Sequence, residues 1–179
     1  AIDGEVYATG KGFVNITDVG NVTITEAKEH GISVNGSGKV DVTAENVTID
    51  SSKAAIWLDD KGDNAVTINA NGSVNLTSKD RFAVNNESVD GGLIDINGKD
   101  ITIISENRTA VKAGGVLGRE GKFGTIDISG EIVTIKGSAQ EPYKDNQPNE
   151  HNASVVYAQG KGIINLSATD KLAIVDTAK

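Results

Sequence analysis

The feature of this sequence that most restricts its fold is a short apolar–polar–apolar triplet that recurs in a fixed order along the whole chain. The first series of triplets begins at Val14, Val40, Val66, Ile94, Ile126 and Ile164. A second triplet follows each of these seven or eight residues later, beginning at Val22, Val47, Val74, Ile101, Val133 and Leu172. A third, looser series begins at Val6, Ile32, Ile56, Val84, Val111 and Val156. The chain therefore consists of repeats, which must be identified before any other feature is interpreted.

The spacing inside the triplets and between them predicts the fold. Apolar residues two positions apart are typical of a strand, whereas an amphipathic helix spaces them three or four apart. The step from Val14 to Val40 is 26 residues, and so is the step from Val40 to Val66. An antiparallel sandwich predicts core faces that differ from strand to strand, but stacked equal repeats explain the constant order. The sequence predicts an all-β parallel β-helix, or β-solenoid, with about six coils of three short strands in one segment over residues 1–179.

Polar residues between the apolar ones repeat as well. The middle positions of the first series hold Asn15, Asp41, Thr67, Asp95, Asp127 and Asn165. If equal positions stack, like residues form ladders in which Asn and Thr hydrogen-bond along the stack. The same composition creates Asn-X-Ser/Thr triplets such as Asn15-Ile16-Thr17, which are potential N-glycosylation acceptors. Because several of them lie inside expected strands, we interpret them as a consequence of the ladders.

Composition argues against several functional classes. The chain has no Cys, so it has no disulfide and no thiol nucleophile, and its two His make a histidine-rich metal site unexpected. The net charge of −8 at pH 7 argues against nucleic acid as a partner, because phosphate contacts need a basic surface. No apolar run of membrane-spanning length, no signal peptide and no Met is visible. We expect no cofactor and no metal, and we expect the chain to be a segment of a longer protein.

Two insertions interrupt the period, at 114–125 and 137–154. The second contains both prolines of the chain, together with Tyr143, Lys144 and His151. Long surface insertions cost little in loop-closure entropy, and loops of repeat proteins often carry binding residues. Tyr143, Lys144 and His151 are therefore candidate binding residues, and a tolerated decoration is the alternative.

The middle positions of the third series provide the other candidates. They hold Tyr7, Ser33, Trp57, Asn85, Lys112 and Tyr157, and strand alternation points them outward. Trp57 is the only Trp, and a solvent-exposed indole often marks a contact surface. Tyr7, Trp57 and Tyr157 are therefore candidate binding residues. The alternative is that Trp57 covers a neighbouring turn, such as the long insertion.

The short V-x-I triplets, the repeat length, the absence of Cys and the passage NVTIDSSKAAIWLDDKGDNAVTINANGSVNLTS resemble passenger domains of bacterial type V autotransporters. The resemblance covers the whole chain. It implies a right-handed parallel β-helix that is exported through the outer membrane by a C-terminal β-barrel, which this sequence does not contain. It also implies display at the cell surface, with anchoring to the bacterial outer membrane only through that barrel.

The function that the resemblance implies is adhesion to a protein or glycan on host cells or other bacteria, or self-association of the chain, without catalysis. One alternative is a passive stalk. Another is a β-helical polysaccharide lyase or hydrolase, which needs clustered carboxylates on an outer face. The nearest such cluster is Asp95 with Asp127, and Asp41 lies two coils before Asp95. A serine hydrolase is not expected, because the dispersed serines lack a Gly-x-Ser-x-Gly elbow.

Overall fold

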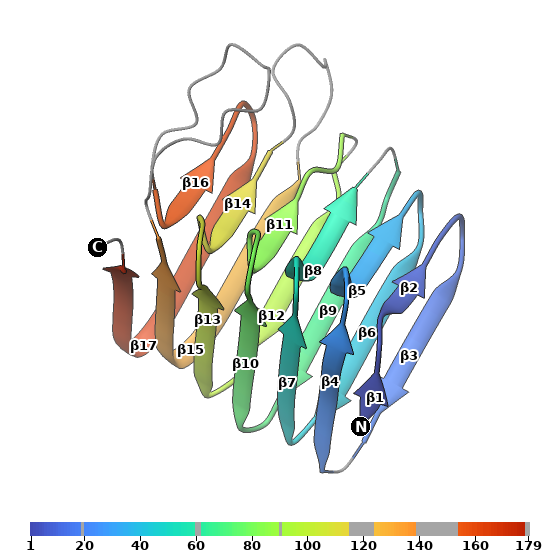
Figure 1. The fold of residues 1–179 in the computed structure, drawn as a ribbon, viewed down its shortest axis with the longest axis horizontal. Helices are drawn as coiled ribbons and strands as arrows, with labels where there is room; N and C mark the ends of the chain where they lie inside the picture. The colour runs from blue at the N-terminus through green and yellow to red at the C-terminus, as the bar shows by residue number, and fades with distance from the viewer. Residues whose placement is uncertain (19, 60–61, 90, 115–123, 139–153, 178–179) are drawn as a thin grey trace.

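The computed structural model describes residues 1–18, 20–59, 62–89, 91–114, 124–138 and 154–177, and in these residues every regular element is a β-strand. All the strand pairs are parallel. Figure 1 shows the chain winding from the N-terminus at one end of a stack to the C-terminus at the other, so that strands far apart in sequence lie side by side. The architecture is all-β with parallel strands in curled sheets, which is compatible with the predicted β-solenoid.

Among the described residues, the first sheet has eleven strands, which are arranged as two arms. One arm contains β1 (Ile2–Asp3), β4 (Asn21–Ala27), β7 (Asn46–Ser51), β10 (Ser73–Ser78) and β13 (Asp100–Ser105). The other contains β3 (Phe13–Thr17), β6 (Lys39–Ala44), β9 (Ala65–Ala70) and β12 (Leu93–Asn97). The long strands β15 (Thr125–Gly137) and β17 (Ile163–Asp176) pair with each other, and β15 pairs with both β12 and β13, so it joins the arms.

In the part of the chain that the structure describes, the second sheet has six strands in the order of the chain. They are β2 (Val6–Ala8), β5 (His30–Asn35), β8 (Ala54–Asp59), β11 (Val84–Asn86), β14 (Val111–Ala113) and β16 (Val156–Ala158). Together with the two arms, this sheet forms a third side around the core (Figure 1).

The strand register confirms the predicted columns. Val14, Val40, Val66, Ile94, Ile126 and Ile164 are consecutive partners in the first sheet. The second series aligns in the same way from Val22 to Leu172, and the third from Val6 to Val156. The inner members of these columns, such as Val40, Val66 and Ile94, are fully buried. β-Branched side chains suit this core because they pack closely on a pleated surface.

The polar ladders are also present. The Nδ2 atom of Asn46 donates to Oδ1 of Asn21 at 2.8 Å, and that of Asn97 donates to Oδ1 of Asn69 at 3.1 Å. Each of these bonds links equivalent positions of neighbouring repeats. Side-chain amides therefore reinforce the backbone ladder along the stack.

The structure differs from the predicted triplets in its last two repeats. The two triplets that begin at Ile126 and Val133 belong to the single strand β15, and those that begin at Ile164 and Leu172 belong to β17. The pairing of β15 with β17 continues through the corner, with a register shift between Gly130 and Ile132. This shift is a β-bulge, in which β17 has one more residue than β15. In β15 and β17 the chain therefore bends from one arm to the other while the hydrogen-bonded pairing of the two strands continues.

Of the two predicted insertions, residues 115–123 and 139–153 lie outside the described residues. The described residues contain no helix that is long and apolar enough to cross a membrane.

Candidate functional site

Trp57 lies in β8, where its register partners in the outward column are Ser33 of β5 and Asn85 of β11. Its side chain is half-buried. The imidazole of His30 stacks on the indole, with ring centroids 4.9 Å apart and an interplanar angle of 27°. The guanidinium carbon of Arg81 lies 5.9 Å from the centroid of the indole, within the range of a cation–π contact. His30, Trp57 and Arg81 come from three successive repeats, and the imidazole and the guanidinium both lie against the indole.

His30 in this stack is half-buried, and its Nδ1 atom is buried without a hydrogen-bond partner. Burial lowers the pKa of His30 below its ordinary value of 6.5, and the carboxylates of Glu5 and Glu29 oppose this effect. Lys53 forms an ion pair with Glu29, and its hydrogen bond lowers the pKa of Glu29. The neutral imidazole is therefore the favoured form beside Trp57 at neutral pH.

Lys112 of β14 continues the outward column but is only 6% exposed. Its ammonium group forms an ion pair with Glu87 and lies 4.9 Å from the centroid of the Phe82 ring. Asn85, between Trp57 and Lys112 in the register, is fully buried. Both Oδ1 and Nδ2 of Asn85 lack a hydrogen-bond partner. A buried amide without a partner costs free energy, so this position is unusual in a native structure.

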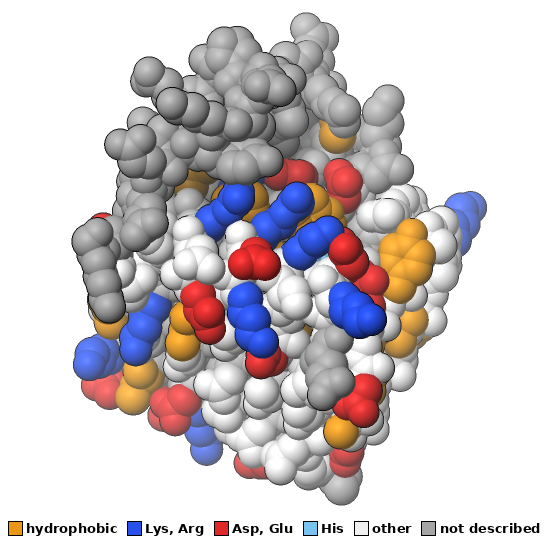
Figure 2. All heavy atoms as spheres, viewed as in Figure 1, with side chains coloured by type: hydrophobic (Ala, Val, Ile, Leu, Met, Phe, Trp, Pro, Cys, Tyr) orange, Lys and Arg blue, Asp and Glu red, His pale blue; other side chains and the backbone are white. Residues whose placement is uncertain are grey.

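Charged residues of both signs border the outward side of the second sheet. The links that connect β4, β7, β10 and β13 to the second sheet contain Lys28, Glu29, Lys53, Lys79, Asp80, Arg81, Glu106 and Arg108, which we call the charged rim. Figure 2 shows Lys and Arg side chains interspersed with Asp and Glu across the middle of the viewed face. The basic members of the rim contrast with the net charge of −8 of the chain. This side of the molecule can therefore form ion pairs with both acidic and basic groups of a partner.

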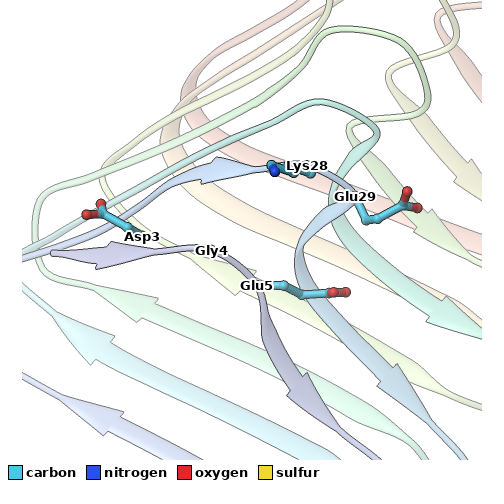
Figure 3. Close-up of a pocket in the computed structure, with 5 residues that line it drawn as sticks. All are labelled: Asp3, Gly4, Glu5, Lys28 and Glu29. Carbon is cyan, nitrogen blue, oxygen red and sulfur yellow. The ribbon is translucent and has the colours of Figure 1, made fainter.

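A shallow hollow of about 360 Å³ lies at the N-terminal end of the charged rim. It is lined by Asp3, Gly4, Glu5, Lys28 and Glu29 (Figure 3). Glu5 and Glu29 extend to the same side in this view, whereas Asp3 points the other way. The part of the chain that the structure describes contains no group of three or more His, Cys, Asp or Glu side chains arranged to hold a metal ion.

The carboxylates considered for lyase chemistry lie away from the charged rim. They belong to β6, β12 and the part of β15 that pairs with β12. Asp95 and Asp127 are direct register partners, while Asp41 is separated from Asp95 by Thr67. Asn97 donates to Oδ1 of Asp95 at 3.1 Å, and Asn165 donates to Oδ1 of Asp127 at 2.7 Å. Hydrogen bonds from amides stabilise such carboxylates within a polar ladder. A lyase activity would be detected as release of unsaturated sugar products by the purified chain. Asp95→Asn or Asp127→Asn should then abolish that release.

The predicted candidate residues are not gathered in one place. Tyr7 and Tyr157 belong to the outward column of Trp57 but lie in the first and last strands of the second sheet. Tyr7 is exposed, and its hydroxyl accepts a hydrogen bond from Nδ2 of Asn35 at 3.2 Å, whereas Tyr157 is half-buried. Tyr143, Lys144 and His151 lie outside the described residues.

Sequence reasoning missed His30 and Arg81 as partners of Trp57. It also predicted outward positions without showing that Ser33, Asn85 and Lys112 would be buried there. A signal in the sequence could have found them. His30 is the first residue of β5 and Arg81 lies shortly before β11, and these two strands flank β8 in the register. Long side chains at such positions reach the neighbouring repeat, only about 4.8 Å away.

Comparisons with protein-family models, with curated protein sequences and with solved structures find no match to this chain.

Proposed function

We propose that this chain is a surface-displayed adhesive segment of an autotransporter passenger. In this proposal it is a right-handed parallel β-helix of six coils, each with three short strands. The continuous register columns and the polar ladders support a rod of stacked coils. Its place is the bacterial cell surface, with attachment to the outer membrane through a C-terminal barrel beyond this sequence.

The contact surface in this proposal is the Trp57 face, which we define as His30, Trp57 and Arg81. The observation that carries the proposal is the stack of His30, Trp57 and Arg81 on the outward side of the second sheet. Trp and Arg are enriched among residues that dominate binding energies. The charged rim beside the face supplies ion pairs and hydrogen bonds. Such a surface suits a protein or glycan on a host or bacterial cell.

The test is the binding of the purified chain to host cells, to bacterial cells and to glycan arrays. We expect Trp57→Ala or Arg81→Gln to weaken binding at least about tenfold, because anchors of this kind contribute about 2 kcal/mol or more. Thr102→Ala, on the outward side of β13, is the matched control and should bind like the unchanged chain. Trp57 is the only Trp, so its emission should also change when a partner binds. Full binding by both variants, with unchanged circular dichroism, would contradict the adhesive role of this face.

A passive stalk is the second candidate function. The observation that favours it is the burial of Ser33, Asn85 and Lys112 in the outward column, where side chains pack on one another instead of facing solvent. A stalk should bind no cell and no glycan in any form, so the same assay separates it from an adhesin.

A further inference from the structure

Two buried polar side chains lie next to each other on the outward side of the second sheet. Asn85 of β11 and Lys112 of β14 are direct register partners, and their strands lie side by side in the middle of the stack (Figure 1). Asn85 is completely buried, and Lys112 is only 6% exposed. Neighbouring strands are about 4.8 Å apart, so the four-carbon side chain of Lys112 is long enough to reach the carboxamide of Asn85.

Contacts on both sides of Asn85 locate the ammonium group of Lys112. It forms an ion pair with Glu87, which follows Asn85 by two residues. It also lies 4.9 Å from the ring centroid of Phe82, which precedes Asn85 by three residues. The ammonium therefore lies over the segment 82–87, to which the carboxamide of Asn85 belongs. An amine, a carboxylate and a carboxamide thus meet in one shielded place.

The carboxamide of Asn85 is not used for hydrogen bonding. Neither its Oδ1 nor its Nδ2 has a hydrogen-bond partner. Asn86, the next residue, is equally buried but takes part in three hydrogen bonds with backbone groups. A buried amide without a partner costs free energy and calls for an explanation. A reaction of this carboxamide with the neighbouring amine provides one.

We propose that Lys112 and Asn85 form an intramolecular isopeptide bond, with Glu87 as the group that carries the proton. A proton passes from the ammonium of Lys112 to the carboxylate of Glu87, which leaves a neutral amine. The lone pair of Nζ attacks Cγ of Asn85 and forms the new bond. As the Cγ–Nδ2 bond breaks, the departing nitrogen keeps its electron pair and takes one proton from Nζ and one from Glu87. Ammonium leaves, and the carboxylate of Glu87 is restored, so no oxidant or further reactant is needed.

The surroundings of these residues favour the reaction. The register holds the amine beside the carboxamide, which makes the attack effectively unimolecular. Burial of both side chains, with the Phe82 ring against the ammonium, keeps out water that would compete as a nucleophile. The new bond would join the neighbouring repeats of β11 and β14 and close a loop over residues 86–111, which restricts the unfolded chain. This inference concerns one chain and is independent of the Trp57 face and of any partner.

The test is the mass of the purified, folded chain after denaturation. We expect the unchanged chain to weigh less than its sequence by one molecule of ammonia. Tandem mass spectrometry of a proteolytic digest should find the peptides of Asn85 and Lys112 joined through their side chains. Lys112→Arg and Asn85→Ala should each have the full mass of their sequence. Glu87→Gln, which is similar in size but cannot take the proton, should link at least about a hundredfold more slowly.

Lys136→Arg is the matched control, because Lys136 occupies an outward position of β15 opposite Ile104. It should lose ammonia like the unchanged chain. A full sequence mass of the folded, unchanged chain would overturn the inference and leave Lys112 and Glu87 as an ion pair only. This result does not depend on whether any variant folds, which circular dichroism checks.

A second outcome would also overturn the inference. An asparagine that closes on its own backbone loses ammonia too, but this reaction does not need Lys112. A loss of ammonia that persists in folded Lys112→Arg would therefore contradict the bond. Cell or glycan binding is scored separately with Trp57→Ala, so failure of the adhesive role leaves this result unaffected.

Discussion

At the scale of single residues, strand alternation divides this chain into side chains that the core requires and side chains that it does not. Ile68 is fully buried and pairs in the register with Val42 and Ile96, which are fully buried as well. Asn15 is exposed, and its Oδ1 accepts a hydrogen bond from the hydroxyl of Thr17 at 3.2 Å. The two positions belong to the same arm of the first sheet. Both positions lie in strands, so their burial, and not their secondary structure, determines how much free energy of unfolding is lost on substitution.

We expect Ile68→Asp to lower the free energy of unfolding by roughly 3–5 kcal/mol, because the carboxylate loses its hydration and gains no partner. Ile68→Val, which removes one methyl group, should cost only about 0.5–1.5 kcal/mol. Asn15→Ala should cost about 0.5 kcal/mol or less, since the position faces water. Urea denaturation of the three variants measures these differences. Equal costs for Ile68→Asp and Asn15→Ala would show that the assigned inner and outer sides are wrong.

His30 makes stability depend on pH. Its pKa is lowered in the folded chain, chiefly by burial, in an environment that also contains Glu5, Glu29, Lys53 and Arg81. The unfolded chain therefore binds the proton more readily, and stability should fall as the pH drops below about 6.5, the ordinary pKa of His.

Above that pH both states carry neutral imidazole, so this contribution should no longer vary. His30→Gln should remove it, and the difference in urea midpoint between the variant and the unchanged chain should change between pH 7.5 and pH 5.5. A constant difference over this range would contradict the lowered pKa. Glu29 titrates below 4.5, outside the window.

At the scale of elements, β11 contains two adjacent asparagines with opposite roles. Asn86 points inward in a column that otherwise holds apolar residues: Ala8, Val34, Leu58, Ala113 and Ala158. Its Nδ2 donates to the carbonyl of Gly92 at 2.8 Å and to that of Thr125 at 2.9 Å, and its Oδ1 accepts from the amide of Ser88 at 3.2 Å. It therefore ties β11 to the turn that follows and to the start of β15. Asn85 beside it is equally buried but has no hydrogen-bond partner.

We expect Asn86→Ala to destabilise the fold by roughly 2–3 kcal/mol, because three backbone groups lose a partner. In the Lys112→Arg chain, where the proposed isopeptide bond is absent, Asn85→Ala should be close to neutral, since it removes a buried amide that makes no hydrogen bond. Thermal or urea unfolding of the two variants makes the comparison, with neighbouring positions in the same strand acting as controls for each other. A larger loss for Asn85→Ala in the Lys112→Arg chain would mean that its amide is satisfied in solution.

At the scale of the whole molecule, each repeat contacts chiefly the repeats on either side of it. The strand pairs β5 with β8, β4 with β7 and β10 with β13 all join neighbouring repeats. Stability in such a stack is a sum of repeat and interface contributions, and an end repeat has one interface instead of two. The ends should therefore open more readily than the centre.

Hydrogen exchange measures this gradient. We expect the slowest amides in β7, β8, β9 and β10, which have a partner strand on each side, and the fastest strand amides in β17 and β2. Uniform protection from end to end would mean that the stack opens only as one cooperative unit.

Much of this fold follows from the sequence alone. The alternation inside each triplet decides which side chain faces inward, because successive residues of a strand point to opposite sides. The constant order of triplets decides the pairing, because a shift by one residue would turn every apolar side chain outward. Val40 and Val66 are neighbours for this reason, and the columns run unbroken from Val14 to Ile164.

Only the tertiary structure decided what happens at the corners and at the ends. The meeting of His30, Trp57 and Arg81 depends on how the links between strands place long side chains over a neighbouring repeat. The different roles of Asn85 and Asn86 depend in the same way on contacts with other repeats. The exposure of Ile174, in a column buried everywhere else in β7, β10, β13 and β15, arises because β17 is the last strand of its arm. Local alternation cannot encode these outcomes, because each is set by which atoms of other repeats come within reach.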